Sequence, residues 1–226
     1  MKNAELTAYL QQFVTDERLD RIATVLAART RYITVALEDI YQPHNASAVL
    51  RTCDACGVQD VHIIENRNSH TLTSGVELGT AQWLTRHRYR NAANNTTQAI
   101  QELRDKGYRI VATSPHCDDV TPAVFDLQKG PAALLFGTEL TGLSEEAMAQ
   151  ADEYIRIPMY GFVESYNISV SVAIILTRLI ERLRDSHLPW ELPNEERSEL
   201  LLQYLRNSIK KVDKLESRFF NEHKQA

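Results

Sequence analysis

Short apolar runs alternate along the middle of the chain with longer segments in which apolar residues recur every three or four positions. The short runs predict strands at residues 33–37, 61–64, 109–113, 132–136 and 154–158. The longer segments predict helices at residues 45–56, at 97–106, shortly after Ser144 and at 168–183. Runs that are apolar throughout are typical of parallel strands covered on both faces. The pattern therefore predicts an α/β fold with a mostly parallel, doubly wound sheet.

Both ends of the chain carry amphipathic helical patterns. Thr15 is placed to cap a helix in which Leu19, Ile22 and Leu26 share one face. After Pro193 the pattern predicts one terminal helix, with apolar positions at Leu201, Leu202, Leu205, Ile209, Val212 and Leu215. Its apolar face could pack on its own domain or on a second subunit. We expect an N-terminal helical extension (1–31), a central domain (32–184) and a C-terminal helical extension (185–226).

The composition is that of an ordinary globular protein, with 43% hydrophobic and 24% charged residues among 226. The first residues lack the long apolar core of a signal peptide, and no run approaches the roughly 20 apolar residues of a membrane span. We therefore expect a cytoplasmic protein without a membrane partner.

The formal net charge of -5 taken alone counts against a nucleic-acid partner, because phosphate binding depends on Lys and Arg. Basic residues nevertheless cluster locally. The candidates for binding RNA are Arg86, Arg88, Arg90, Lys210 and Lys211. Each cluster is equally compatible with a solvated surface that keeps the protein soluble.

Three cysteines are present, Cys53, Cys56 and Cys117. An odd number, with two of them three residues apart in a predicted helix, indicates reduced thiols rather than disulfides. A Cys-x-x-Cys pair can also bind zinc, but no second Cys or His pair stands at the required spacing. We expect no metal site.

Three segments place glycine or small polar residues directly after predicted strands, where open α/β sheets bind ligands. The first, 43–51, contains Asn45, which is placed to cap a helix, and Arg51. The second, 135–143, contains Gly137, Glu139 and Gly142. The third, 157–171, is dense in hydroxyl and amide groups and contains Ser165 and Asn167, either of which could be a helix cap. Each segment alone is compatible with an ordinary turn or cap.

The phosphate-binding and dinucleotide-binding glycine patterns are both absent from the sequence, which argues against ATP hydrolysis and nicotinamide chemistry. In their order along the chain, the three segments instead resemble the SPOUT superfamily, and within it the TrmH (SpoU) family of RNA ribose methyltransferases. The family motifs run Asn-x5-Arg, Phe-Gly-x-Glu-x-x-Gly and Ile-Pro-Met-x-Gly-x3-Ser-x-Asn-x-Ser. The match extends from about Tyr32 to Arg184, and Tyr166 departs from it where the family more often has Leu.

The resemblance implies a homodimer whose sheet ends in a deep trefoil knot, an exception to the rule that chains avoid knots. It also implies that S-adenosylmethionine is bound by the knot loops. The implied cofactor-binding residues are Thr113, Gly137, Gly142, Ile157, Tyr166 and Asn167.

The resemblance further implies transfer of a methyl group to a ribose 2′-hydroxyl. Arg51 then lies nearest that hydroxyl and orients it, since an arginine is a poor general base. Asn45, Ser165 and Asn167 position the reactants, and Glu139 anchors its motif through hydrogen bonds. These five are the candidate catalytic residues.

Short extensions on both sides resemble the tRNA branch of the family, which methylates guanosine 18 in the D-loop. A ribosomal-RNA target is the alternative within the family. From other classes, a catalytically silent RNA-binding dimer and an unrelated α/β enzyme remain open, although the joint presence of the motif residues disfavours both. We expect His44, His87 and His116 at the surface, because none has an evident acidic partner in the sequence.

Overall fold

The computed structural model describes residues 2–40, 42–67, 79–115 and 120–222. The chain divides into two compact units. The terminal unit combines Met1–Arg29 with Glu191–Ala226, and the central unit is Thr30–Trp190.

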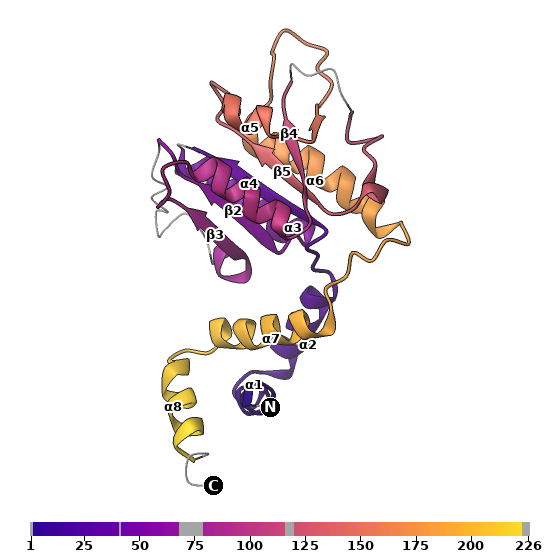
Figure 1. The fold of residues 1–226 in the computed structure, drawn as a ribbon. Coiled ribbons are helices and arrows are strands. Elements are labelled where there is room, and N and C mark those ends of the chain that lie inside the picture. The colour runs from indigo at the N-terminus through magenta and orange to yellow at the C-terminus, as the bar shows by residue number, and fades with distance from the viewer. Residues whose placement is uncertain (1, 41, 68–78, 116–119, 223–226) are drawn as a thin grey trace. The chain divides into compact units, whose positions relative to one another are not determined.

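Six strands of the described residues form one sheet in the central unit, in the order β3-β2-β1-β5-β4-β6 (Figure 1). Their bounds are β1 Ile33–Glu38, β2 Asp60–Ile64, β3 Thr85–Tyr89, β4 Arg109–Thr113, β5 Ala132–Phe136 and β6 Glu153–Ile155. Every neighbouring pair is parallel. The predicted parallel α/β sheet is therefore confirmed.

Strand β3 was missed by the sequence pattern, which showed its residues only as a basic cluster. Arg86 and Arg88 are exposed on it, whereas Tyr89 is buried. An edge strand can carry charged residues at alternate positions because it has a neighbour on one side only. Its polar residues therefore gave no apolar run.

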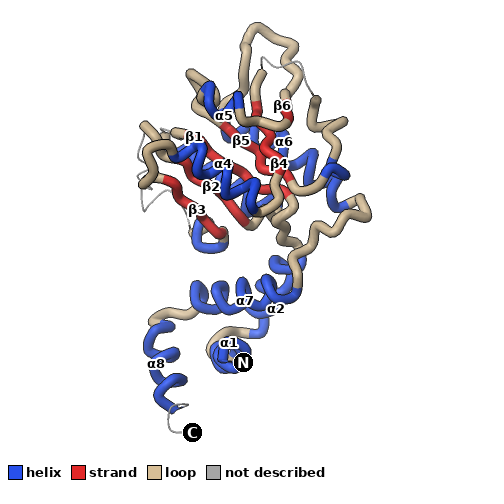
Figure 2. The backbone as a smooth tube through the Cα atoms, in the orientation of Figure 1, coloured by secondary structure: helices blue, strands red, loops and turns tan. Residues whose placement is uncertain are grey.

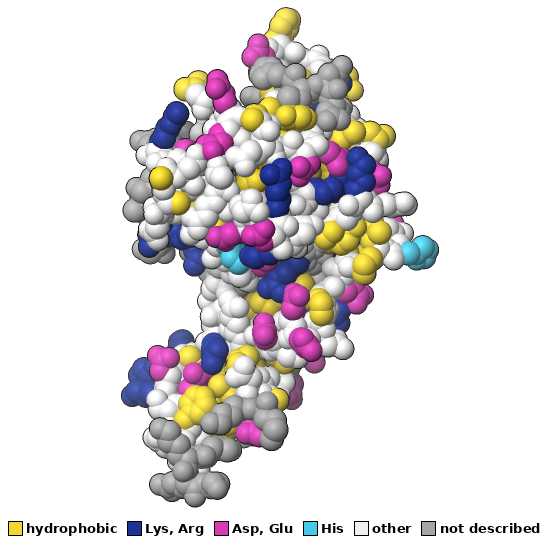
Figure 3. All heavy atoms as spheres, viewed as in Figure 1, with side chains coloured by type: hydrophobic (Ala, Val, Ile, Leu, Met, Phe, Trp, Pro, Cys, Tyr) yellow, Lys and Arg dark blue, Asp and Glu magenta, His cyan; other side chains and the backbone are white. Residues whose placement is uncertain are grey.

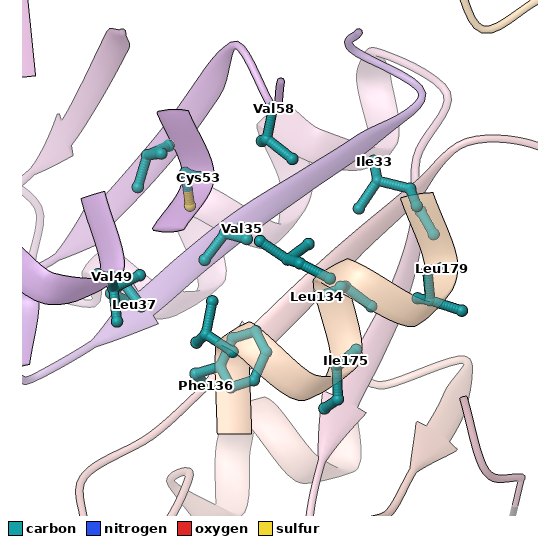
Figure 4. Close-up of a cluster of buried hydrophobic side chains, with 14 of the residues drawn as sticks. Ile33, Val35, Leu37, Val49, Cys53, Val58, Leu134, Phe136, Ile175 and Leu179 are labelled. Carbon is teal, nitrogen blue, oxygen red and sulfur yellow. The ribbon is translucent and has the colours of Figure 1, made fainter. Parts of the chain in front are cut away.

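Helices cover both faces of the sheet (Figure 2). In the central unit the helices are α3 Pro43–Cys56, α4 Asn95–Asp105, α5 Glu145–Ala149 and α6 Ile168–Arg184, with short 3-10 turns η1 Ala81–Trp83 and η2 Leu127–Lys129. Helices α3 and α6 pack on one face, where Val35 and Leu134 of the sheet meet Ile175 (Figure 4). Helices α4 and α5 pack on the other face, where Ala36 and Leu135 meet Ile100. The alternation of side chains along each strand thus builds two cores.

The compact central unit includes residues 185–190. The hydroxyl of Thr30 donates to the carbonyl oxygen of Trp190 at 2.6 Å. The guanidinium of Arg184 lies over the Trp190 ring, 5.7 Å from its centre. These contacts hold residues 185–190 to the central unit rather than to the C-terminal helices.

The terminal unit is built from α1 Lys2–Gln11, α2 Asp16–Ala27, α7 Asn194–Ser208 and α8 Val212–Glu222. Thr15 caps α2 as predicted, accepting from the backbone N–H of Arg18 at 3.3 Å. Leu6, Ile22 and Leu205 are buried in this unit. Helices from the two ends of the chain therefore share one small core.

The prediction of a single C-terminal helix was wrong. The helix ends at Ser208, Ile209 is extended, and Lys211 has a φ of +59°. No glycine marks this turn, and an unbranched lysine adopts the left-handed region at modest cost. The apolar pattern ran on across the break and hid it. No helix in the described part of the chain is long and apolar enough to cross a membrane.

Candidate active site

The three motif segments meet at the edge of the sheet formed by the carboxyl ends of the strands. Strands β1 and β5 are neighbours, with Leu37 beside Phe136. The chain therefore enters α3 next to the point where it enters the 137–143 loop. The third segment follows β6 and leads into α6, which packs against α3.

Asn45, Glu139 and Asn167, one from each segment, form a cluster of hydrogen bonds that we call the edge cluster. The Nδ2 of Asn45 donates to Oε1 of Glu139 at 3.0 Å. The Nδ2 of Asn167 donates to the same Glu139 oxygen and to Oδ1 of Asn45 at 3.1 Å. Asn45 is buried, whereas Glu139 and Asn167 are exposed. Residues up to 122 positions apart are thus joined through one carboxylate oxygen.

Asn45 does not cap a helix, which corrects the sequence interpretation. Helix α3 begins at Pro43 with Gln42 in the capping position, so Asn45 lies within its first turn. A proline at the first helical position is favourable because that position needs no N–H partner. The side chain of Asn45 is thereby left to contact Glu139 and Asn167.

Asn167 is the cap of α6. Its Oδ1 accepts from the backbone N–H of Ser169 at 2.9 Å and from the Ser169 hydroxyl at 2.6 Å. One side chain therefore starts the helix with its oxygen and joins the edge cluster with its nitrogen. Ser165 does not cap this helix.

The loop after β5 folds back on itself within six residues. The N–H of Thr138 donates to the carbonyl of Gly142 at 2.9 Å, and the reverse bond measures 3.0 Å. Gly142 has a φ of +70°, which side chains disfavour. A Cβ on Gly137 would lie 2.1 Å from the Gly142 carbonyl carbon. Both glycines are required by the shape of the loop.

A pocket of about 450 Å³ opens beside this loop. It is lined by Thr113, Ser114, Pro115, Phe136, Gly137, Thr138, Glu139, Leu140, Thr141, Gly142, Leu143, Met148, Glu164, Ser165, Tyr166, Ile168 and Ser171. Of the residues named as cofactor-binding, Thr113, Gly137, Gly142 and Tyr166 line it. The lining combines apolar side chains, hydroxyls and two carboxylates.

Four candidate residues lie outside the lining, one of them Asn45, which contacts the Glu139 side chain. Ile157 packs against the core under α3 and α6 and lines a separate groove with Pro158 and Ile174. Asn167 contributes through the edge cluster. Arg51 is exposed on α3, and the pocket lining does not include it.

Several lining residues were missed by the sequence interpretation. Ser114 and Pro115 directly follow β4 and lie at the same edge of the sheet as the glycine loop. Their position directly after a predicted strand could have identified them as ligand-binding candidates. Met148 had no signal, because it belongs to α5, whose packing the sequence does not specify, whereas Leu143 and Ile168 lie within the 135–143 and 157–171 segments.

The predicted basic residues are in different surroundings. Arg88 forms an ion pair with Glu65, whose side chain is buried, with Nη2 2.9 Å from Oε1. Arg86 and Arg90 are exposed, as are Lys210 and Lys211 between α7 and α8. On the face of the central unit that Figure 3 shows, basic side chains are interspersed with acidic ones.

His87 is not a surface residue, which corrects the expectation for it. Its ring is half-buried and stacks on His62 with 4.5 Å between ring centres. Its Nε2 lies 3.8 Å from the carboxylate of Asp60 on the neighbouring strand β2, a partner that only the strand pairing reveals. His44 is exposed, and His116 lies outside the described residues.

Cys53 is buried and Cys56 is half-buried on α3, and Cys117 lies outside the described residues. Among the residues that the structure describes, no three His, Cys, Asp or Glu side chains are grouped so that they could bind a metal.

Comparison with known proteins bears directly on this site. Residues 32–177 match the SpoU rRNA Methylase family. This range contains all three segments and the first turns of α6. The tRNA (guanosine(18)-2'-O)-methyltransferase of Borreliella burgdorferi is 46% identical over 92% of this chain and 93% of its own length. The enzyme of the same name from Thermus thermophilus is 39% identical over 72% of this chain and 81% of its own length.

Among solved structures, the A. aeolicus TrmH/SpoU tRNA modifying enzyme superposes with a TM-score of 0.74 at 30% identity, covering 87% of this chain and 98% of that chain. That coverage includes more than the central unit. Sequence match, fold and motif order agree, and this chain belongs to the SpoU methylase family.

Proposed function

We propose that this protein transfers a methyl group from S-adenosylmethionine to the 2′-hydroxyl of guanosine 18 in the tRNA D-loop. The observation that carries the proposal is the edge cluster, in which one residue from each family motif is joined beside a pocket at the carboxyl edge of the sheet. The names of the Borreliella burgdorferi and Thermus thermophilus relatives supply the nucleotide.

The pocket fits S-adenosylmethionine in size and chemistry. Its volume of about 450 Å³ lies in the range of sites for small molecules. Leu143, Met148 and Ile168 offer an apolar wall to an adenine ring. The carboxylates of Glu139 and Glu164 also face the pocket and would favour a sulfonium cation. Thr113, Gly137, Gly142 and Tyr166 are the proposed cofactor contacts, with Ile157 and Asn167 supporting the loops.

When bound, the cofactor supplies an activated methyl group to an attacking oxygen. The residues of this chain must then hold the ribose hydroxyl in line with that methyl group. Arg51 follows Asn45 by six residues on α3, which is about 9 Å along the helix. Its exposed guanidinium can bind the substrate phosphate and orient the hydroxyl, while Ser165 offers a further hydroxyl at the pocket.

We propose a homodimer as the active species. Leu140 is 94% exposed, Tyr160 is 96% exposed and Phe162 is fully exposed. Large apolar side chains this exposed on neighbouring loops are typical of a surface that another chain covers. A groove lined in part by Ile157, Pro158 and Ile174 adds further accessible apolar surface beside α6. We also propose that the loops after β4, β5 and β6 form a trefoil knot. We propose a cytoplasmic location as well, because tRNA is found there.

The test is incubation with tritiated S-adenosylmethionine and separate pools of unmodified tRNA and ribosomal RNA, followed by nuclease digestion and mass spectrometry. We expect 2′-O-methylguanosine in the tRNA D-loop. Label in ribosomal RNA alone would retain the chemistry and overturn the substrate. Absence of label in both, with RNA still bound, would support a silent RNA-binding dimer.

Arg51→Ala tests the role of the arginine. We expect transfer to fall at least 100-fold while S-adenosylmethionine binding changes less than threefold, since Arg51 is proposed to act on the nucleophile and its phosphate. Equal loss of binding and transfer would show that this role is wrong.

A further inference from the structure

Glu38, the last residue of β1, has a carboxylate that joins three parts of the central unit. It is 3% exposed. Its Oε2 accepts from the backbone N–H of Ser144 at 2.8 Å, and its Oε1 accepts from the Ser144 hydroxyl at 2.8 Å. The Thr96 hydroxyl, in the first turn of α4, donates to Oε1 at 2.5 Å. One buried side chain thus connects β1, α4 and the residue that caps α5.

Ser144 directly follows Gly142 and Leu143, which line the pocket. The 137–143 loop is therefore fixed at two points by carboxylates. Within the loop, Glu139 accepts from Asn45 and Asn167. At the end of the loop, Glu38 accepts from both polar groups of Ser144.

We infer that Glu38 is a positioning residue for cofactor binding: it fixes the α5 end of the glycine loop and so sets the position of the pocket wall. The inference rests on the proposed function in that the pocket is taken to bind S-adenosylmethionine. Glu38 is not a catalytic residue, because the pocket lining does not include it and it acts through Ser144.

The three hydrogen bonds to Glu38 require an acceptor side chain as long as glutamate. An ionised carboxylate has only acceptor sites, so all three donors are satisfied without a competing N–H. A glutamine in its place would present an amide NH₂ to at least one donor, and a buried donor without an acceptor is costly. An aspartate is one methylene shorter and would pull the loop or lose the contact. The positive N-terminal end of α4 beside Thr96 also favours a negative charge.

A merely structural role can be separated from a positioning role with a matched pair of variants. Ser144→Ala removes the side-chain bond to Glu38 on the loop side, and also the α5 cap, in which the Ser144 hydroxyl accepts from the backbone N–H of Ala147 at 3.1 Å. Thr96→Val removes the bond on the α4 side, and also releases the Nδ2 of Asn66, which donates to the Thr96 hydroxyl at 2.8 Å. Each variant therefore loses two side-chain hydrogen bonds, and those of Thr96→Val lie away from the loop.

The experiment measures three quantities for the full-length protein and its Glu38→Gln, Ser144→Ala and Thr96→Val variants. They are S-adenosylmethionine binding by calorimetry, tRNA binding by filter retention and stability to urea. We expect Glu38→Gln to weaken cofactor binding at least tenfold and to raise the KM for S-adenosylmethionine, with tRNA affinity changed less than twofold. Ser144→Ala should weaken cofactor binding severalfold, and Thr96→Val less than twofold.

Equal weakening of cofactor binding by Ser144→Ala and Thr96→Val, or normal binding by Ser144→Ala, would overturn the inference even if Glu38→Gln fails to fold. Wild-type protein that binds no S-adenosylmethionine would instead overturn the proposed function.

Discussion

Two polar clusters differ in how they are built, one beside the carboxyl ends of the strands and one on the strands themselves. The edge cluster joins three segments distant in sequence, and two of its three members are exposed. The second cluster, which we call the strand cluster, consists of Asp60, His62, His87 and Tyr89 on β2 and β3. There the Tyr89 hydroxyl lies 2.9 Å from Nδ1 of His62, which is 1% exposed.

The difference in exposure predicts different roles for the two clusters, one in the shape of the binding site and the other in the stability of the fold. Exposed hydrogen bonds contribute little to the free energy of folding, because water competes for both partners. The edge cluster therefore acts mainly by fixing which loops face the pocket. A buried cluster contributes to stability only while its groups keep their partners and protonation states. We expect variants of the edge cluster to change binding more than stability, and variants of the strand cluster to do the reverse.

The largest effect is expected from Gly137→Ala, next to the edge cluster. The added Cβ would lie 2.1 Å from the backbone of Gly142, so the loop must open. We expect cofactor binding, measured by calorimetry, to fall at least 100-fold. The matched control is Gly107→Ala, which lies outside the pocket lining: a Cβ there meets nothing within 4 Å, and the φ of +84° makes alanine costly to stability, but binding should change less than twofold. Equal binding by the two variants would contradict the role of the loop.

Asn167→Ala breaks the edge cluster itself. It removes the cap of α6, at a cost of about 1 kcal/mol, and both bonds from Nδ2. Asn94 caps α4 in the same way, accepting from the N–H of Thr97 at 3.0 Å, and does not line the pocket. We expect similar losses of stability to urea from Asn167→Ala and Asn94→Ala. Only Asn167→Ala should weaken cofactor binding and transfer, by at least tenfold. If both variants lose binding equally, the loss comes from reduced stability and not from the edge cluster.

The strand cluster predicts a pH dependence of stability. Burial, with the nearby His87, lowers the pKa of His62 to about 3. The unfolded chain takes up this proton near pH 6.5, so acid favours unfolding between those values, by at most about 1.4 kcal/mol per pH unit. The stability is present above pH 6.5 and is lost as the pH falls.

His62→Gln keeps a hydrogen-bonding group beside the Tyr89 hydroxyl but does not titrate. We expect wild-type protein to lose about 2 kcal/mol of stability to urea between pH 6.5 and 5, and the variant to lose clearly less. Burial would raise the pKa of Asp60, but the nearby His87 and Arg31, whose Nε donates to the carboxylate at 3.0 Å, lower it, so this carboxylate adds a loss of the same sign at lower pH. Cofactor binding at pH 8 should be the same in both proteins. Parallel pH profiles would show that His62 does not carry the effect.

The sequence predicted the α/β alternation because five of the six strands are apolar runs. It missed β3, whose charged residues occupy an edge, and the break at Lys211, which no glycine marks. The three motif segments were found from their residues, but the contact of Asn45 with Glu139 depends on the pairing of β1 with β5. Contacts of this kind, like that of Glu38 with Ser144, arise from tertiary structure and have no local pattern.

The smallest effect concerns the basic residues of β3, the strand that also carries His87. Arg88 is paired with buried Glu65, whereas Arg90 is exposed just beyond the strand. If β3 contacts tRNA phosphates, Arg90→Ala should weaken tRNA binding severalfold and lower the slope of log affinity against log salt concentration by about one unit. Arg88→Ala should instead reduce stability to urea, because Glu65 loses its cation. If Arg90→Ala leaves the salt dependence of tRNA binding unchanged, β3 does not contact the tRNA phosphates. The strand cluster and β3 would then contribute to stability alone, whereas the edge cluster contributes to binding.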